Sequence, residues 1–379
     1  MATASADADQ PTSTETCKAI WLVGHGGYDK LQVKNTPVTS PGDGEVRVAV
    51  QACGLNFAEL MMRQGLYRRS PTLPYIPGFE CSGTVESLGD NVTGLEVGQR
   101  VVCVPGHGSW SEKIVLKFDH VFPIPDSMSF EEAAAIPVNY ITAYMMLFDV
   151  AHLSPGKKIL VHMAAGGVGT AVTQLARTVE NVTIFGTASS SKHETIRQAG
   201  VDHPIDYRSV DYEQAVRSIS PDGVDIVLDP LGGKDVKKGV NLLRPLGITV
   251  LFGFANVVTE SKNYFNLAKQ IAGFDLGGLF GVPQAKEAAT KLLQLYEEGA
   301  IKPRIDSVYS FAQVAAAQKR MHDRLNVGKI ILVPHKEEEK QDTPTAEESR
   351  QGGEMSENME TKKEETKETE NEEEAEPNK

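Results

Sequence analysis

Cysteine is scarce in this chain. Only four cysteines occur in 379 residues, at Cys17, Cys53, Cys81 and Cys103. No two of them form a CxxC pair, which excludes a zinc knuckle built from neighbouring residues, and so few cysteines in a long chain are typical of a reducing compartment. Cys53 and Cys81 could be drawn together as a metal pair, but buried cysteines on strands are the better interpretation.

An excess of basic residues is also missing. The chain carries 51 acidic and 38 basic residues, for a net charge of −13. Residues 336–379 hold 17 of the acidic and 7 of the basic residues, so residues 1–335 hold 34 and 31 and are nearly neutral. Nucleic-acid binding requires a basic face that neutralises phosphates. We therefore expect no nucleic-acid partner.

No uncharged run is long enough for a membrane-spanning helix, which needs about 20 apolar residues. The longest runs, Ala133 to Phe148 and Pro245 to Thr259, are shorter and contain proline, glycine or asparagine. The segment Met1 to Thr16 lacks the basic and apolar regions of a secretory signal. These absences predict a cytoplasmic protein whose contact with membranes, where it occurs, is peripheral.

The pattern of the chain changes twice. Residues 1–17 read as a disordered leader, and residues 18–142 contain short β runs separated by glycine and proline turns, which predict a barrel or distorted sheet. Residues 143–300 alternate strands with helices, which predicts a doubly wound parallel sheet. Residues 336–379 have almost no apolar side chains and read as a disordered acidic tail. The tail could bind calcium loosely, but solubilisation or partner docking is the simpler role.

The strongest local motif lies between an expected strand and an expected helix, from Val161 to Thr170. It fits the G-x-G-x-x-G template with Ala164 in the first position, followed by Gly166 and Gly169, with Gly167 and Val168 between them. Gly166 lets the backbone approach a pyrophosphate, and the helix start offers free N–H groups to it. A plain glycine-rich turn is the alternative, but the strand–turn–helix context favours a dinucleotide cofactor.

The end of the following strand bears on the choice between NAD and NADP. An NAD site has an acidic residue there for the ribose 2′-hydroxyl, whereas Gly186 to His193 contains no carboxylate. Ser189 can donate a hydrogen bond to a 2′-phosphate and Lys192 can supply positive charge. The sequence therefore predicts NADPH. A solvated helix start is the alternative role for Lys192.

Four motifs together resemble those of the medium-chain dehydrogenase/reductase superfamily, in its zinc-free quinone oxidoreductase branch. They are Pro77 to Val85, Gly98 to Val101, Ile136 to Tyr144 and the glycine turn Ala164 to Gly169. The similarity extends from about Lys18 to Val333. It implies a GroES-like, β-barrel-type catalytic domain over residues 18–142 and a Rossmann NADP-binding domain over residues 143–300. Residues 301–335 would then return to the catalytic domain.

The resemblance also implies an activity, the NADPH-dependent reduction of quinones or activated enones by hydride transfer in a homodimer. The alternative is a catalytically weak nucleotide-binding protein that acts peripherally on vesicle or organelle membranes or binds lipid. The apolar segment 274–282 suits that alternative, but it equally suits a dimer edge or a strand between domains.

Zinc-containing members of the superfamily take ligands from positions that resemble Asn56, Phe79 and Asn139 here. Phenylalanine cannot bind a metal, and neutral amides are poor zinc ligands. Glu80 is present without those partners. We therefore expect no zinc.

Further site residues follow from the resemblance. Tyr207 is similar to the tyrosine beside the adenosine 2′-phosphate, and Asn326 to a late asparagine near the cofactor. Phe252 and Phe254 lie on the strand end that passes the nicotinamide.

The catalytic candidates are polar side chains near the expected nicotinamide end. Asn56 can donate a hydrogen bond from its amide to a substrate oxygen, although it also suits a helix N-cap. Tyr67 can donate a proton or a hydrogen bond, or simply pack. Glu59 stands where an aspartate is common in relatives. His107 and His162 are better explained as loop or core residues.

Overall fold

The first sheet grows from a long central strand, β3 (Glu45–Leu55). Val46, Val48 and Val50 are buried and the residues between them are partly exposed, as expected for a strand with one face on a core. The sheet order is β13-β14-β3-β4-β5-β7, and β6 also pairs with β3. The other strands are β4 (Cys81–Leu88), β5 (Arg100–Cys103), β6 (Lys113–Lys117), β7 (Val121–Pro123), β13 (Ile305–Ser310) and β14 (Lys329–Val333).

Three cysteines lie side by side across this sheet. Cys53 of β3 is opposite Cys81 of β4, which is opposite Cys103 of β5. All three are buried free thiols, and Cys53 Sγ donates to the carbonyl oxygen of Ser109 at 2.9 Å. They are strand residues of the core, which agrees with the interpretation made from the sequence.

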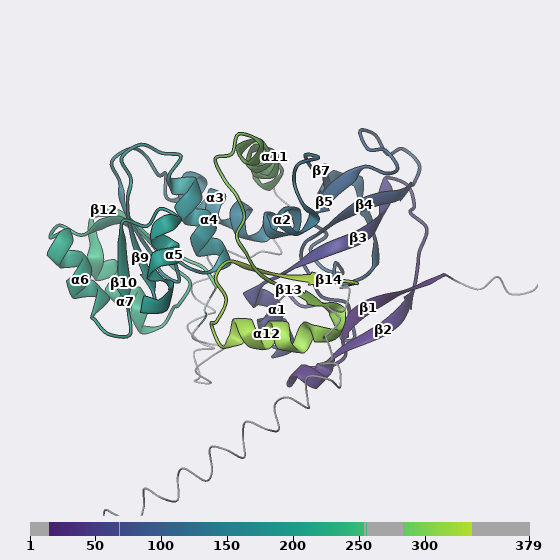
Figure 1. Cartoon of the computed structure of the whole chain (residues 1–379), viewed down its shortest axis with the longest axis horizontal. Coiled ribbons are helices and arrows are strands. Elements are labelled where there is room, and N and C mark those ends of the chain that lie inside the picture. Colours follow the sequence, from purple (N-terminus) through teal and green to yellow (C-terminus); the bar gives the residue numbers. More distant parts are fainter. Residues whose placement is uncertain (1–14, 68, 254, 256–282, 336–379) are drawn as a thin grey trace, which may run out of the picture. The chain divides into compact units, whose positions relative to one another are not determined.

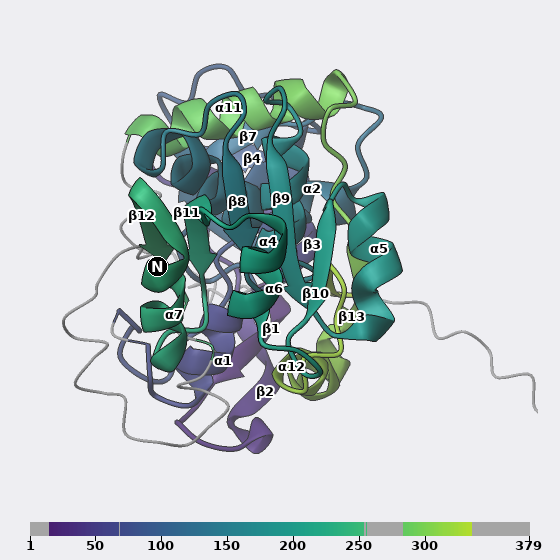
Figure 2. The same cartoon turned by 90° about the vertical axis from the view of Figure 1, so that its left-hand side faces the viewer.

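The second sheet is parallel and five-stranded, with the order β10-β9-β8-β11-β12. Helices separate its strands along the chain, which is the connection that parallel strands require. Figure 2 shows the five strands next to one another with these helices around them. The strands are β8 (Lys158–Val161), β9 (Thr183–Ala188), β10 (His203–Asp206), β11 (Val224–Asp229) and β12 (Leu243–Leu251), and the helices are α4 (Gly167–Ala176), α5 (His193–Gln198), α6 (Tyr212–Ile219) and α7 (Lys234–Leu242).

A helical stretch, Phe130–Val150, connects the two sheets along the chain. Ser129 starts it with a capping box, because its Oγ accepts the Glu132 N–H at 3.1 Å and the Glu132 carboxylate accepts the Ser129 N–H at 3.2 Å. The stretch is long and apolar enough to cross a membrane, but 78% of its most apolar window is buried inside the protein. Its parts are α2 (Phe130–Ala135), η3 (Pro137–Ile141), α3 (Thr142–Tyr144) and η4 (Met145–Val150).

The end of the described chain returns to the first sheet. After α11 (Pro283–Glu297), strand β13 leads through η6 (Phe311–Gln313) and α12 (Val314–His322) into β14, which pairs antiparallel with β3. Figure 1 shows α12 beside α1 (Phe57–Arg63). Arg63 Nε of α1 donates to Gln318 Oε1 of α12 at 2.7 Å, so a buried hydrogen bond joins the two helices.

An antiparallel hairpin precedes β3, formed by β1 (Thr16–Leu22) and β2 (Leu31–Pro37). Thr16 and Cys17 lie in β1, although their composition placed them in the leader. The computed structural model describes residues 15–67, 69–253, 255 and 283–335. The predictions for the remaining leader, for Phe254, for the segment 274–282 and for the acidic tail fall outside these residues. The GroES-like and Rossmann parts of the predicted α/β fold are confirmed.

Candidate cofactor and active site

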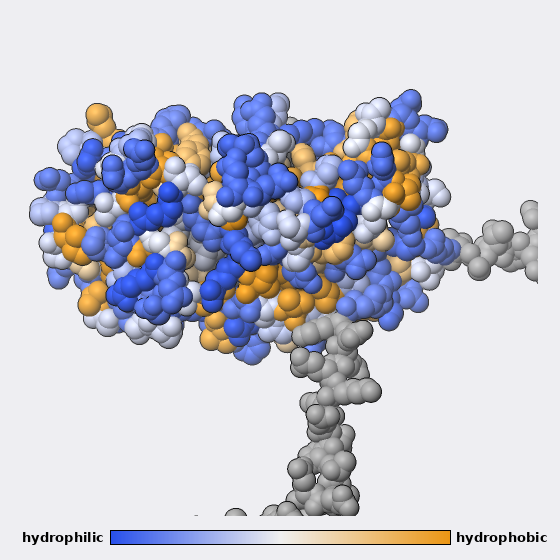
Figure 3. Space-filling model, turned by 45° about the horizontal axis from the view of Figure 1, so that its top comes forward, coloured by the Kyte–Doolittle hydropathy of each residue, from blue (hydrophilic) through white to orange (hydrophobic). Residues whose placement is uncertain are grey.

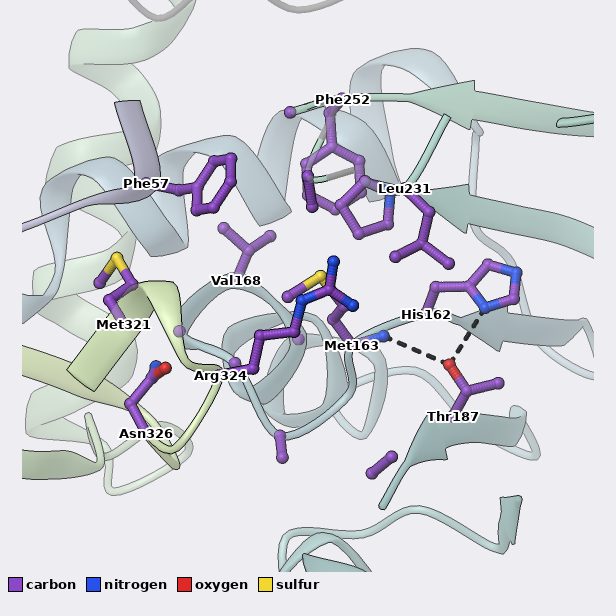
Figure 4. A pocket seen from close by; sticks show the side chains of 18 of the residues that line it. Phe57, His162, Met163, Val168, Thr187, Leu231, Phe252, Met321, Arg324 and Asn326 are labelled. Carbon is purple, nitrogen blue, oxygen red and sulfur yellow. Dashed lines mark hydrogen bonds between the residues drawn. The ribbon is translucent and has the colours of Figure 1, made fainter. Parts of the chain in front are cut away.

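A pocket of about 1420 Å³ opens at the carboxyl ends of the five parallel strands. The residues that follow β8, β9, β10, β11 and β12 line it, which is where open parallel sheets bind their ligands. The opposite wall comes from α1 and from the loop after α12. The pocket is therefore lined by both parts of the fold (Figure 4).

The glycine turn forms the middle of this pocket. Gly166 caps α4, and Gly166, Gly167, Val168 and Gly169 all line the pocket. A Cβ atom on Gly169 would lie 2.5 Å from the carbonyl oxygen of Met163, so only glycine lets the helix approach the turn this closely. The first N–H groups of this ten-residue helix have no partner within the helix. The turn therefore fits a pyrophosphate at its helix start.

Ala164, which the sequence predicts among the cofactor-binding residues, does not itself line the pocket. It is buried, and its N–H donates to the carbonyl oxygen of Thr187 at 3.0 Å, which holds the turn against strand β9. Ala165 lines the pocket instead. Ala164 thus shapes the turn from behind, where its Cα would lie 2.7 Å from a Cβ on Gly169.

One end of the pocket is rich in cationic and hydroxyl groups. Ser189, Lys192 and Tyr207 line it as expected, and the structure adds Arg208 and Arg324. Figure 4 shows Arg324 extending across the pocket. These groups suit a phosphate ester on a ribose, because arginine, lysine and hydroxyl groups all donate to its oxygens.

Lys192 is not a solvated helix start. Its Nζ donates to the carbonyl oxygens of Arg324 and Asn326, each at 2.8 Å. Burial lowers the pKa of Lys192, and the nearby Asp306 carboxylate opposes that shift. Lys192 therefore joins the start of α5 to the loop that follows α12.

That loop is fixed from several sides. Gly328 donates its N–H to the carbonyl oxygen of Ala165 at 2.9 Å, next to the glycine turn. Asn326 Nδ2 donates to the carbonyl oxygen of Gly328 at 3.0 Å, and Asn326 lines the pocket. The position predicted for Asn326 near a cofactor agrees with this geometry, and its amide also holds the loop in shape.

The other end of the pocket is largely apolar. Phe57, Val168, Leu231 and Phe252 surround one part of it in Figure 4. The Phe252 N–H donates to the carbonyl oxygen of Asp229 at 2.9 Å, so the strand end that carries this ring is ordered by the sheet. A flat aromatic or quinone ring fits such a surface.

Asn56 links this apolar end to a buried ionic group. It is 5% exposed and lies between β3 and α1. Its Nδ2 donates to Glu80 Oε1 at 2.8 Å, and its Oδ1 accepts from Lys329 Nζ at 2.6 Å. Lys329 Nζ lies 2.5 Å from the same Glu80 oxygen. Asn56 and Lys329 both line the pocket, whereas Glu80 lies behind them.

Glu59 lies one helical turn further on and does not line the pocket. It is 1% exposed, and its Oε2 accepts the Asn56 backbone N–H at 2.8 Å. Burial raises the pKa of Glu59 to about 8, an increase that Lys329 opposes and Glu80 reinforces. Glu59 is therefore largely protonated at neutral pH and supports Asn56 from behind.

Tyr67 lines the pocket and is half-buried. Its ring meets that of Phe79 edge to face, with 5.8 Å between centroids. The packing role and the hydroxyl role considered for Tyr67 are therefore compatible. The two histidines differ: His107 is exposed in a loop, whereas His162 is buried, and burial lowers its pKa to about 4.

The donor groups at this end do not fit zinc. Of the three corresponding positions, Phe79 packs against Tyr67 and has no donor atom. The Glu80 carboxylate is bound to the Lys329 ammonium, which would repel a metal cation. Among residues 15–67, 69–253, 255 and 283–335, no three His, Cys, Asp or Glu side chains come together to hold a metal ion.

Comparison with known proteins places this geometry in a family. The alcohol dehydrogenase GroES-like domain matches residues 42–126, and the zinc-binding dehydrogenase model matches residues 199–332. The synaptic vesicle membrane protein VAT-1 homolog of Danio rerio is 52% identical over 352 residues, covering 86% of this chain and 72% of that protein. This chain belongs to the medium-chain dehydrogenase/reductase superfamily. It shares the oxidoreductase fold of that superfamily and is closely similar to its VAT-1 group.

Solved structures of similar proteins agree with this family assignment. The human VAT-1 homolog-like protein is 45% identical with a TM-score of 0.75, covering 86% of this chain and 99% of that chain. A quinone oxidoreductase of Pseudomonas syringae is 31% identical with a TM-score of 0.76, and the match covers 84% of this chain and 100% of that chain. The mycobacterial protein Rv1454c, solved with NADPH, is 27% identical with a TM-score of 0.71, and the match covers 84% of this chain and 100% of that chain.

Sequence reasoning missed Arg208, Arg324 and Lys329. Arg324 lies in a loop whose approach to the glycine turn depends on the fold. Lys329 directly precedes the apolar run Ile330 to Val333, and its burial is visible only in the structure, where it is 3% exposed.

Proposed function

We propose that this protein reduces quinones or activated enones with NADPH by hydride transfer. The observation that carries the proposal is one continuous pocket with a cationic end, a helix start in the middle and an apolar end beside Asn56. This sequence of surfaces matches the phosphate, pyrophosphate and nicotinamide parts of a dinucleotide, with a ring substrate beside the last. NADPH, when bound, supplies the hydride.

Residues of the chain bind NADPH and orient it against the substrate. The backbone N–H groups at the start of α4 hold the pyrophosphate, and Ser189, Lys192 and Tyr207 contact the 2′-phosphate. Phe252 confines the ring systems at the apolar end. These contacts place the two reacting rings together, which is the main protein contribution to a hydride transfer.

Substrate polarisation falls to Asn56 and Tyr67. A quinone that accepts a hydride also takes up one proton to become a hydroquinone. The Asn56 NH₂ group donates a hydrogen bond to the carbonyl oxygen as negative charge develops on it. The Tyr67 side chain lines the pocket, and we assign its hydroxyl the transfer of that proton from solvent.

The first test is NADPH and NADH binding by calorimetry to the wild type, to Lys192→Ala and to a matched control, Lys291→Ala, on the exposed side of α11. We expect NADPH to bind at least tenfold more tightly than NADH. Lys192→Ala should remove most of that difference, because it removes charge near the 2′-phosphate and releases the Arg324 carbonyl. Equal binding of the two nucleotides by the wild type would contradict the assignment.

Activity is tested with a panel of quinones and enones under saturating NADPH. Consumption of NADPH only in the presence of one of these substrates supports the proposal. A chain that binds NADPH and consumes none across the panel would instead be a nucleotide-binding protein. Sedimentation velocity at micromolar concentration tests the homodimer that we also propose, and a single monomer boundary would contradict it.

A peripheral role on cytoplasmic vesicle membranes is the second candidate, because the relatives are named synaptic vesicle membrane proteins. On the face shown in Figure 3, hydrophobic residues form separate groups among hydrophilic ones. Co-sedimentation with liposomes of neutral and anionic composition tests direct binding. Absence of the protein from every liposome pellet would exclude it.

A further inference from the structure

In the buried group formed by Lys329, Glu80 and Asn56, the two charged side chains determine the orientation of the Asn56 amide. An ammonium group only donates hydrogen bonds and a carboxylate only accepts them. Asn56 therefore has one arrangement that satisfies both partners, with its oxygen toward Lys329 at 2.6 Å and its nitrogen toward Glu80 at 2.8 Å. The two charges fix which end of the amide faces which way.

The fold holds these charges rigidly. Lys329 is 3% exposed and begins β14, whose next residue pairs with Leu55 at the end of β3. Glu80 is fully buried, and its second oxygen accepts the Val138 N–H at 2.7 Å. A Cβ atom on Gly54 would lie 2.2 Å from Glu80 Oε1, so this carboxylate fits only because position 54 is glycine.

One hydrogen of the Asn56 NH₂ group remains after these contacts. Within the part of the chain that the structure describes, Asn56 Nδ2 donates only to Glu80, and Asn56 lines the apolar end of the pocket. A cation bound to the amide oxygen draws electron density from the nitrogen and makes its hydrogens stronger donors. Lys329 thus both orients and strengthens the donor.

We propose that Lys329 is a positioning residue for hydride transfer: held by Glu80, it binds the Asn56 oxygen and so presents the Asn56 NH₂ group to the substrate carbonyl. This rests on the proposed function, and it deepens that function by naming what prepares the donor. The charge of Lys329 is balanced by Glu80, so the pair stays in place without a metal ion.

Removing Lys329 alone would leave Glu80 as an unpaired buried charge, and that variant could fail to fold. The informative protein is therefore the double variant Lys329→Met/Glu80→Gln, which is neutral at both positions. A glutamine can either donate to or accept from Asn56, so it does not fix the amide. Lys291→Met on the exposed side of α11 is the matched control.

We expect the double variant to bind NADPH within about twofold of the wild type and to show kcat for a quinone lowered about 10- to 100-fold, as for the loss of part of an oxyanion donor. A readout independent of turnover is the binding of 4-nitrophenolate in the presence of NADP⁺, followed by absorbance. Its phenolate oxygen resembles the charge that develops on the carbonyl. Its affinity should fall by a similar factor.

A mutant cycle shows whether Lys329 acts through Asn56. In an Asn56→Ala background, adding Lys329→Met/Glu80→Gln should lower kcat no further. A full additional loss would mean that the charges act by another route and would overturn the proposal. Unchanged kcat and phenolate binding in the double variant would also overturn it while leaving the oxidoreductase function intact. A wild-type protein that reduces no quinone or enone would contradict both the oxidoreductase function and the role of Lys329.

Discussion

At the scale of single residues, the least expected feature is the carboxyl group of Glu59. Its side chain is buried behind Asn56, and burial raises its pKa from the ordinary 4.5 to about 8. Between these two pH values the folded protein keeps a proton that the unfolded chain releases. The free energy of unfolding contributed by this group therefore falls as pH rises through this range.

Glu59→Gln should remove this dependence. The stability of the variant relative to wild type should increase between pH 5 and pH 8 by at most about 1.4 kcal/mol per pH unit. Urea unfolding at several pH values measures the difference, with the exposed Glu287→Gln on α11 as control. Parallel stability curves for wild type and Glu59→Gln would show that Glu59 is ionised in the folded protein.

The residue scale also shows where prediction from sequence stops. The resemblance to the family predicted Asn56 as a site residue, and Asn56 does line the pocket. Its partner Lys329 is 273 residues away in the chain, and they meet only because β14 adds to β3. No local pattern encodes a contact of that kind.

At the scale of elements, the change from short β runs to alternating strands and helices predicted the two large sheets. The strand and the helix expected on either side of the motif Val161 to Thr170 are β8 (Lys158–Val161) and α4 (Gly167–Ala176). The elements that escaped prediction are short or polar. Strand β13 (Ile305–Ser310), for example, is only partly buried throughout, so it shows no alternation to detect.

The glycine turn allows a prediction that separates fold from binding. Gly169→Ala should destabilise the protein by about 1–3 kcal/mol, because its Cβ would overlap Met163 and Ala164. Gly166→Ala meets only the Met163 oxygen, at 3.2 Å, so it should change stability much less. It should still weaken NADPH binding, because its methyl group stands before the helix N–H groups. Thermal unfolding and calorimetry on both variants test this, and equal stability losses would contradict it.

At the scale of the whole molecule, one large hydrophobic cluster extends through both sheets, and a smaller cluster of its own lies at each sheet. A single contiguous cluster includes Ile20 and Val48 from the first part of the fold and Val161 and Ile184 from the parallel sheet. The loop after α12 adds hydrogen bonds to Lys192 and Ala165. Much of the core therefore depends on both sheets, and the pocket is lined by residues of both parts of the fold.

This shared core predicts cooperative unfolding of both parts together. Calorimetry should show a single transition, and NADPH at 100 times its Kd should stabilise the protein by about 2.7 kcal/mol, raising the midpoint by roughly 4 °C. At the same NADPH concentration as for the wild type, Lys192→Ala should reduce the shift, because it loosens both the phosphate contact and the loop that closes the pocket. Two separate transitions, of which NADPH moves only one, would mean that the parallel sheet folds independently and that the shared core adds little.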